Sequence, residues 1–103
     1  MNIISIILLC FISLSLRAWT DCTYTNAKNI QVQKTGVLVL FTDSQGSSRW
    51  KLVVRHGDSY SASFQSVIQQ AIATNKPVMV RYESDNYDCS ALDYGTLPIA
   101  IRM

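Results

Sequence analysis

Side chains that could carry out chemistry are few in this sequence. His56 is the only histidine, and it opens the sequence His-Gly-Asp, which is typical of a tight turn. Asp85, Asp88 and Asp93 share one polar segment, but their spacing fits no known loop for Ca²⁺, a cation that prefers several oxygen ligands. Since catalysis needs a nucleophile with a base, a metal cluster or paired carboxylates, we predict no catalytic residue, no metal site and no cofactor.

Aromatic rings are the second kind of group that could bind a ligand, because exposed rings stack on sugars and on protein partners. Trp50 and Tyr82 alternate in phase with apolar neighbours, so we expect both in the core. Tyr60, Tyr87 and Tyr94 fall in segments predicted to be loops. These three tyrosines are therefore the candidate ligand-binding residues.

The N-terminal segment is typical of a signal peptide. Residues 3–16 are almost unbroken apolar sequence, shorter than the roughly 20 residues that span a bilayer comfortably. Leu16-Arg17-Ala18 then places a small residue where signal peptidase would cut. We predict a signal peptide at 1–18 and a mature periplasmic or secreted domain at 19–103. Because no Lys or Arg precedes the apolar run, an uncleaved anchor remains the alternative.

Two cysteines, Cys22 and Cys89, remain after removal of the predicted signal peptide. An even pair in an oxidising compartment is expected to form a disulfide, so we predict Cys22–Cys89. Closing so long a loop would constrain the unfolded chain by about 4 kcal/mol in the entropy model. No Cys-x-x-Cys sequence is present, which favours a structural bond over a redox role.

The charges do not indicate a polyanionic partner. The chain has 9 basic and 7 acidic residues, a net charge of +2, and nucleic-acid binding normally needs a concentrated basic face. The basic side chains of the mature domain are instead scattered singly, and we interpret them as solvated strand faces: Lys28, Lys34, Arg49, Lys51, Arg55, Lys76, Arg81 and Arg102.

Hydrophobic periodicity predicts the secondary structure. Alternation of period two predicts strands at 29–33, 37–42, 50–55, 78–83 and 99–102. A stripe of period 3.6 predicts one helix at 63–74, with Ser61 or Ser63 as its N-cap. Asn75 suits the left-handed position after the helix, and Pro77 prevents continuation. A polar loop at 84–97 precedes the last strand.

This order of elements predicts one domain of mainly β structure. Three strands, a helix and two strands match the five-stranded OB-fold barrel, whereas an SH3-like barrel lacks so long a helix and a ferredoxin-like fold needs a second one. The segment 37–41 is apolar at every position, more than a strand with one wet face requires. Either a subunit interface or a covering helix would use this apolar surface.

The sequence resembles the B subunits of AB5 toxins, most closely the Shiga type. The matching residues are Asp21-Cys22 after the leader, Phe64-Gln65-Ser66-Val67-Ile68 on the helix, Val78 and Val80 on the next strand, and Cys89. Similarity to the cholera type lies in the tail, at 88–90 and 97–103, and similarity to the subtilase type around the helix, at 62–64 and in Gln70-Ala71 before Pro77-Val78. The resemblance spans nearly all of residues 19–103, by pattern more than by rare residues.

The resemblance implies an OB-fold with one disulfide, a homopentameric ring with helices lining a pore, and a face that binds host glycans. It also implies an exported A-type partner, and none of the families' sugar-contacting residues can be placed on this sequence. We therefore expect an exported, non-enzymatic binding subunit that spans no membrane and binds no nucleic acid. The alternatives are a monomeric periplasmic OB-like protein that binds or inhibits a protein partner, and a structural subunit of a surface assembly.

Overall fold

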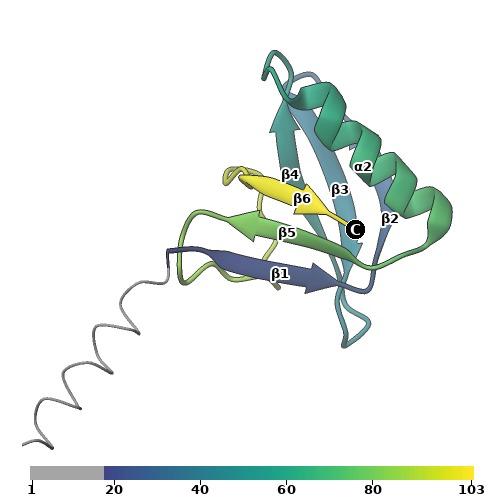
Figure 1. The fold of residues 1–103 in the computed structure, drawn as a ribbon, viewed down its shortest axis with the longest axis vertical. Coiled ribbons are helices and arrows are strands. Elements are labelled where there is room, and N and C mark those ends of the chain that lie inside the picture. Colours follow the sequence, from purple (N-terminus) through teal and green to yellow (C-terminus); the bar gives the residue numbers. More distant parts are fainter. Residues whose placement is uncertain (1–17) are drawn as a thin grey trace, which may run out of the picture.

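The computed structural model describes residues 18–103, and the predicted signal peptide lies almost entirely outside the described residues. The described chain forms six strands and one helix (Figure 1). No helix within 18–103 is long and apolar enough to cross a membrane. The elements are β1 (Thr20–Tyr24), β2 (Asn26–Val32), β3 (Gly36–Thr42), β4 (Ser48–Arg55), α2 (Ser61–Thr74), β5 (Val78–Tyr82) and β6 (Ala100–Arg102).

The strands form two small antiparallel sheets. One has the order β2-β3-β4 and the other the order β1-β5-β6. The chain passes from one sheet to the other at Thr25, whose amide and hydroxyl both donate to the carbonyl of Thr42, at 2.8 and 3.0 Å. The prediction of three antiparallel strands before the helix is confirmed for β2, β3 and β4.

The additional strand is β1, which brings the total to six instead of the predicted five. It is short and pairs with β5 in antiparallel register, with Cys22 opposite Val80. Only Cys22 and Tyr24 are buried in it, alternating with exposed polar residues. Two buried positions are too few for a clear period-two signal, which is why the sequence pattern did not predict this strand.

The helix α2 begins at Ser61, two residues earlier than predicted, and ends at Thr74 as predicted. Tyr60 occupies the N-cap position without a side-chain capping bond, so the predicted serine cap is wrong. The Ser61 hydroxyl instead accepts a hydrogen bond of 3.0 Å from Gln65. At the other end Asn75 adopts a left-handed conformation with φ 54°, which confirms the prediction for this position.

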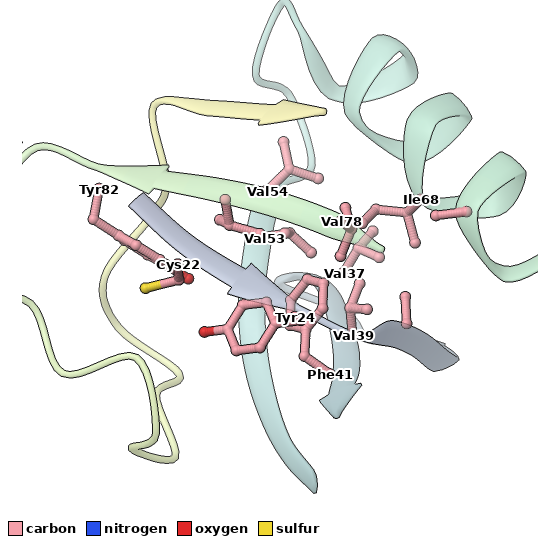
Figure 2. Packing of buried hydrophobic residues seen from close by; sticks show 13 residues of the cluster. Cys22, Tyr24, Val37, Val39, Phe41, Val53, Val54, Ile68, Val78 and Tyr82 are labelled. Atoms are coloured by element: carbon pink, nitrogen blue, oxygen red, sulfur yellow. The ribbon is translucent and has the colours of Figure 1, made fainter. Parts of the chain in front are cut away.

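The core lies between the two sheets and the helix. Figure 2 shows Val37, Val39 and Phe41 of β3 meeting Val78 of β5 and Ile68 of α2. At its other end the ring of Tyr24 stacks on Phe41 with centroids 4.6 Å apart, and Tyr82 is fully buried. The prediction that Tyr82 belongs to the core is confirmed.

A β-bulge reverses the side-chain orientation along β4. Val37 pairs with Val54, but the next residue of β3, Leu38, pairs with Leu52, so Val53 is an extra residue in β4. An inserted residue shifts the alternation of side chains, so each residue before it in the strand points to the opposite face from the one that strict alternation predicts. Lys51, opposite Val39, therefore faces the core, and Trp50 faces away.

Two predictions about β4 are therefore wrong. Lys51 was expected on a solvated face, but its side chain is 0 % exposed. Trp50 was expected in the core, but it is only partly buried and lies outside the core cluster.

Gly36 is required by the close approach of β4 to β3 at this bulge. A β-carbon at Gly36 would lie 2.5 Å from the Val54 carbonyl oxygen and 2.9 Å from Leu52 Cδ1. We expect Gly36→Ala to lower the free energy of unfolding by about 1–3 kcal/mol, measured by urea denaturation, because the backbone must move apart. Gly95→Ala, whose β-carbon would meet only Asp93 Oδ1 at 3.9 Å, is the matched control. Equal midpoints for the two variants would contradict this account.

Candidate functional site

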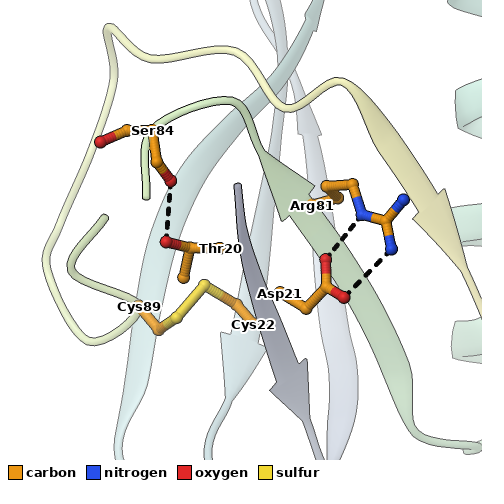
Figure 3. A network of polar contacts seen from close by, with 6 residues as sticks. All are labelled: Thr20, Asp21, Cys22, Arg81, Ser84 and Cys89. Atoms are coloured by element: carbon orange, nitrogen blue, oxygen red, sulfur yellow. Dashed lines mark hydrogen bonds and ion pairs between the residues drawn. A yellow bond between two sulfur atoms is a disulfide. The ribbon is translucent and has the colours of Figure 1, made fainter. Parts of the chain in front are cut away.

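The predicted disulfide is present and fixes the long segment between β5 and β6. Cys22 of β1 and Cys89 are bonded at 1.99 Å, with 67 residues of separation (Figure 3). Two hydrogen bonds fasten the same segment to β1: Tyr24 Oη donates to the Cys89 carbonyl at 2.8 Å, and Thr20 Oγ1 donates to the Ser84 carbonyl at 2.8 Å. We call this segment, residues 83–99, the 83–99 loop.

An ion pair and a stacked aromatic ring join the start of β1 to the end of β5. Arg81 donates to both carboxylate oxygens of Asp21, at 2.7 and 3.1 Å (Figure 3). The guanidinium also lies 4.4 Å from the ring centroid of Trp19. Both charged side chains are partly exposed, so the pair contributes little to stability and mainly orders the first residues of the strand.

The buried Lys51 is the most unusual polar group of the described structure. Its Nζ donates to Tyr87 Oη at 2.7 Å and to the Asp88 carbonyl at 3.3 Å, and lies 4.5 Å from the Tyr87 ring centroid. Tyr87 Oη in turn donates to Asp93 Oδ2 at 2.6 Å. We call Lys51, Tyr87 and Asp93 the Lys51 relay, because it connects β4 through a buried hydroxyl to a carboxylate of the 83–99 loop.

Burial and hydrogen bonding shift the pKa values of this relay. Burial lowers the pKa of Lys51, although the nearby carboxylates of Asp93 and Asp88 oppose the shift. Burial, followed by the bond to Asp93, raises the pKa of Tyr87. Burial opposes ionisation of Asp93, but the bonds from Tyr87 and from the amides of Gly95 and Thr96 outweigh it and lower its pKa. A neutral tyrosine thus separates a cation from an anion.

The loop aspartates act as turn-forming residues in this structure. Asp93 Oδ1 accepts bonds from the amides of Gly95 and Thr96, at 2.8 and 2.9 Å, and Asp88 Oδ1 accepts one from Ser90 at 3.0 Å. Within residues 18–103, no three His, Cys, Asp or Glu side chains are grouped so that they could hold a metal ion. Asp85, Asp88 and Asp93 therefore share a segment of the sequence without forming a metal site in the described structure.

His56 lies at a turn, as the sequence indicated. One of its ring nitrogens, Nε2, is 2.6 Å from the carbonyl oxygen of Gln33, and Gly57 has a left-handed φ of 94°. The contact closes the open end of the sheet, because Gln33 follows β2 and His56 follows β4.

The three candidate tyrosines lie in three different environments. Tyr87 is only partly exposed, stacks on Tyr82 with centroids 3.6 Å apart, and uses its hydroxyl in the Lys51 relay. Its position gives it a role within the fold. Tyr94 is exposed near the tip of the 83–99 loop, and Tyr60 is exposed at the start of α2.

Two cavities with apolar linings lie between α2 and the C-terminal residues 98–103. One cavity of about 320 Å³ is lined by Tyr60, Phe64, Pro98 and Ile99. A second, of about 380 Å³, lies farther along α2 beside β6 and is lined by Ser66, Val67, Gln70, Ile101, Arg102 and Met103. We call these two cavities together the α2/β6 groove, and Figure 1 shows β6 running towards the helix here.

The groove was only partly visible in the sequence. Phe64 and Val67 belong to the predicted apolar stripe of the helix, and Tyr60 was a predicted candidate. The exposure of Ile99 and Met103 was not predicted, because a short final strand of alternating residues gives no sign of which face is covered. No protein-family model matches this chain, and no curated protein or solved structure is significantly similar to it.

Proposed function

We propose that this protein is an exported, non-enzymatic binding subunit that assembles into a homo-oligomeric ring and binds host glycans. The observation that carries the proposal is the α2/β6 groove. Ile99, which lines one cavity with Tyr60, and Met103, which lines the other, expose 51 % and 50 % of their surface. Apolar side chains gathered along a groove are typical of a surface that another protein covers.

The position of β6 supports a second copy of this chain as the partner. β6 is an edge strand that pairs with β5 on one side, and its other edge faces the groove. An edge strand offers unpaired backbone donors and acceptors. A copy docked there would cover both the apolar side chains and the strand edge, and repeated contacts of this head-to-tail kind close into rings.

Export is supported by the disulfide and by the apolar leader of the sequence. Disulfides persist mainly in oxidising compartments such as the periplasm or the extracellular space. Cleavage near Ala18 would leave Trp19 at the mature N-terminus, directly before β1.

The arrangement of the elements supports the likeness to toxin B subunits. We infer that the two sheets and α2 form an OB-type barrel, with β1 and β2 as one bent strand interrupted at Thr25. The disulfide joins the first strand to the segment before the last, as the resemblance implied. On this proposal an exported A-type subunit is the natural partner of the ring.

The second candidate function is a monomeric periplasmic protein that binds or inhibits another protein. The same groove favours it, since an apolar cleft beside a strand edge also accepts an extended segment of a different protein. The mass in solution separates the two candidates, because only the first needs contacts between copies.

We expect the double variant Ile99→Glu/Met103→Glu to be monomeric, while the unchanged protein forms a ring. Both side chains are half exposed, so the glutamates cost the fold little but place charge in the proposed interface. Light scattering behind a sizing column measures the mass, and circular dichroism checks the fold. Val32→Glu, at an apolar residue that is 64 % exposed and outside the groove, is the matched control. A double variant with the mass of the unchanged protein would exclude this interface.

A further inference from the structure

The face of β2-β3-β4 that points away from the core is defined by the strand register. Leu38 and Leu40 of β3 are opposite Gln31 and Asn29 of β2, and opposite Leu52 and Trp50 of β4. Directly paired residues share a face, and none of these six belongs to the core cluster, although Leu38 and Leu52 are buried, with 4 % and 6 % of their surface exposed. We call this surface the outer face.

Uncharged side chains dominate the outer face. Asn29 and Gln31 are exposed amides, and at one end Thr42 and Ser48 share a hydrogen bond of 2.9 Å between their hydroxyls. The first charged position in this register is Arg55, opposite Gly36 at the far end of β4. Amides and hydroxyls therefore lie beside an aliphatic and aromatic strip, and the exposed Lys28, the bulged residue of β2, adjoins Asn29.

The tip of the 83–99 loop extends this face beside β4. Asp93 forms a parallel bridge to Lys51, with its amide donating to the Trp50 carbonyl at 3.2 Å and its carbonyl accepting from the Leu52 amide at 2.8 Å. The Asp93 side chain points to the core side, where it meets Tyr87. Leu92 and Tyr94 flank Asp93 in this loop, and their side chains are 57 % and 55 % exposed.

Several contacts immobilise this exposed tip. The Lys51 relay holds the Asp93 carboxylate, the two amides of Gly95 and Thr96 hold its other oxygen, and the disulfide at Cys89 anchors the preceding residues. A buried lysine is costly to keep in a small domain. Its contacts fix a loop whose apolar side chains point into solvent, which is an arrangement that lowers the entropy lost on binding.

We propose that Trp50 and Tyr94, with the amides of Asn29 and Gln31, form a binding face for neutral saccharides. Rings of this kind stack on the C–H face of a sugar, and amides exchange hydrogen bonds with its hydroxyls. The inference rests on the proposed function for the class of ligand and adds the site. The Lys51 relay positions Tyr94 and does not touch the saccharide.

The test uses the oxidised mature protein on a printed array of lactose- and mannose-terminated oligosaccharides and their sialylated counterparts. We expect binding to neutral oligosaccharides and about tenfold weaker binding by Tyr94→Ala, with unchanged mass and thermal midpoint. Trp19→Ala removes an exposed aromatic ring that precedes β1 of the other sheet and is the matched control, with binding equal to that of the unchanged protein.

A second measurement isolates the positioning role. Tyr87→Phe should accelerate hydrogen exchange at the Gly95 and Thr96 amides and weaken saccharide binding, although residue 87 lies on the core side. Equal binding by Tyr94→Ala and the unchanged protein would overturn the assignment of this face but leave the proposed function intact. Preference for sialylated oligosaccharides would overturn the neutral class. A ring that binds no oligosaccharide would overturn this inference and the glycan part of the proposed function together, whereas assembly is judged separately by mass.

Discussion

Replacement of both cysteines by alanine, Cys22→Ala/Cys89→Ala, is expected to lower the free energy of unfolding by about 4 kcal/mol. The bond closes a loop of 67 residues, and its removal restores the corresponding chain entropy to the unfolded state. Small domains are stable by only about 5–15 kcal/mol, so this loss is a large share of the margin. Urea denaturation followed by tryptophan fluorescence measures the effect.

Reduction of the unchanged protein is the control for the cavities that the two alanines leave. Cys22 is buried, so part of the loss in the double variant comes from the missing sulfur atoms. A reducing agent breaks the bond without removing these atoms and should give a slightly smaller loss. A reduced protein as stable as the oxidised one would contradict the assignment of the disulfide as the main cross-link of the fold.

Tyr87→Phe is expected to lower the free energy of unfolding by about 2–4 kcal/mol, measured in the same way. The change removes only the hydroxyl, but that oxygen accepts from Lys51 and donates to Asp93. The buried ammonium would keep only its longer bond to the Asp88 carbonyl. Tyr94→Phe removes a hydroxyl from an exposed ring and should change the stability by less than about 0.5 kcal/mol.

A second substitution tests whether the lost stability comes from the unpaired ammonium of Lys51. Adding Lys51→Met to Tyr87→Phe should restore part of the lost stability, because it removes the ammonium that would otherwise lack its partner. If the two substitutions acted independently, their losses of stability would add in the double variant. That result would contradict the relay.

The pH dependence follows from the lowered pKa of Lys51. The unfolded chain holds this proton more tightly than the folded protein, so the cost of burying the charge is complete at neutral pH. This cost of burial decreases as the pH rises towards 10.5, the ordinary pKa of lysine. Above pH 10 the ionisation of tyrosine lowers the stability instead, because burial raises the pKa of Tyr82 to about 12. The stability lost in Tyr87→Phe should therefore shrink between neutral pH and about pH 9.

Much of the fold follows from local patterns in the sequence. The strands β2, β3 and β5 carry clear runs of alternating or apolar residues, and the stripe from Phe64 to Ile72 followed by Asn75 and Pro77 defines the helix end. The disulfide followed from an even pair of cysteines after an apolar leader.

The remaining features depend on contacts that no local pattern contains. The bulge at Val53 depends on how β4 registers with β3, and it moves Lys51 into the interior. The relay joins residues 36 positions apart, so Tyr87 was predicted to be a surface residue from its loop alone. The loop tip lies beside β4 only because Asp93 bridges to that strand, which a loop sequence does not reveal.

The absolute mass of the oxidised domain of residues 19–103 in solution tests the proposed assembly most directly. Native mass spectrometry or light scattering behind a sizing column gives this value without knowledge of any ligand. The account predicts a discrete ring, five copies on the likeness to toxin B subunits, that persists on dilution and is lost in Ile99→Glu/Met103→Glu. A stable monomer at all concentrations would contradict it and leave the α2/β6 groove to a different protein partner.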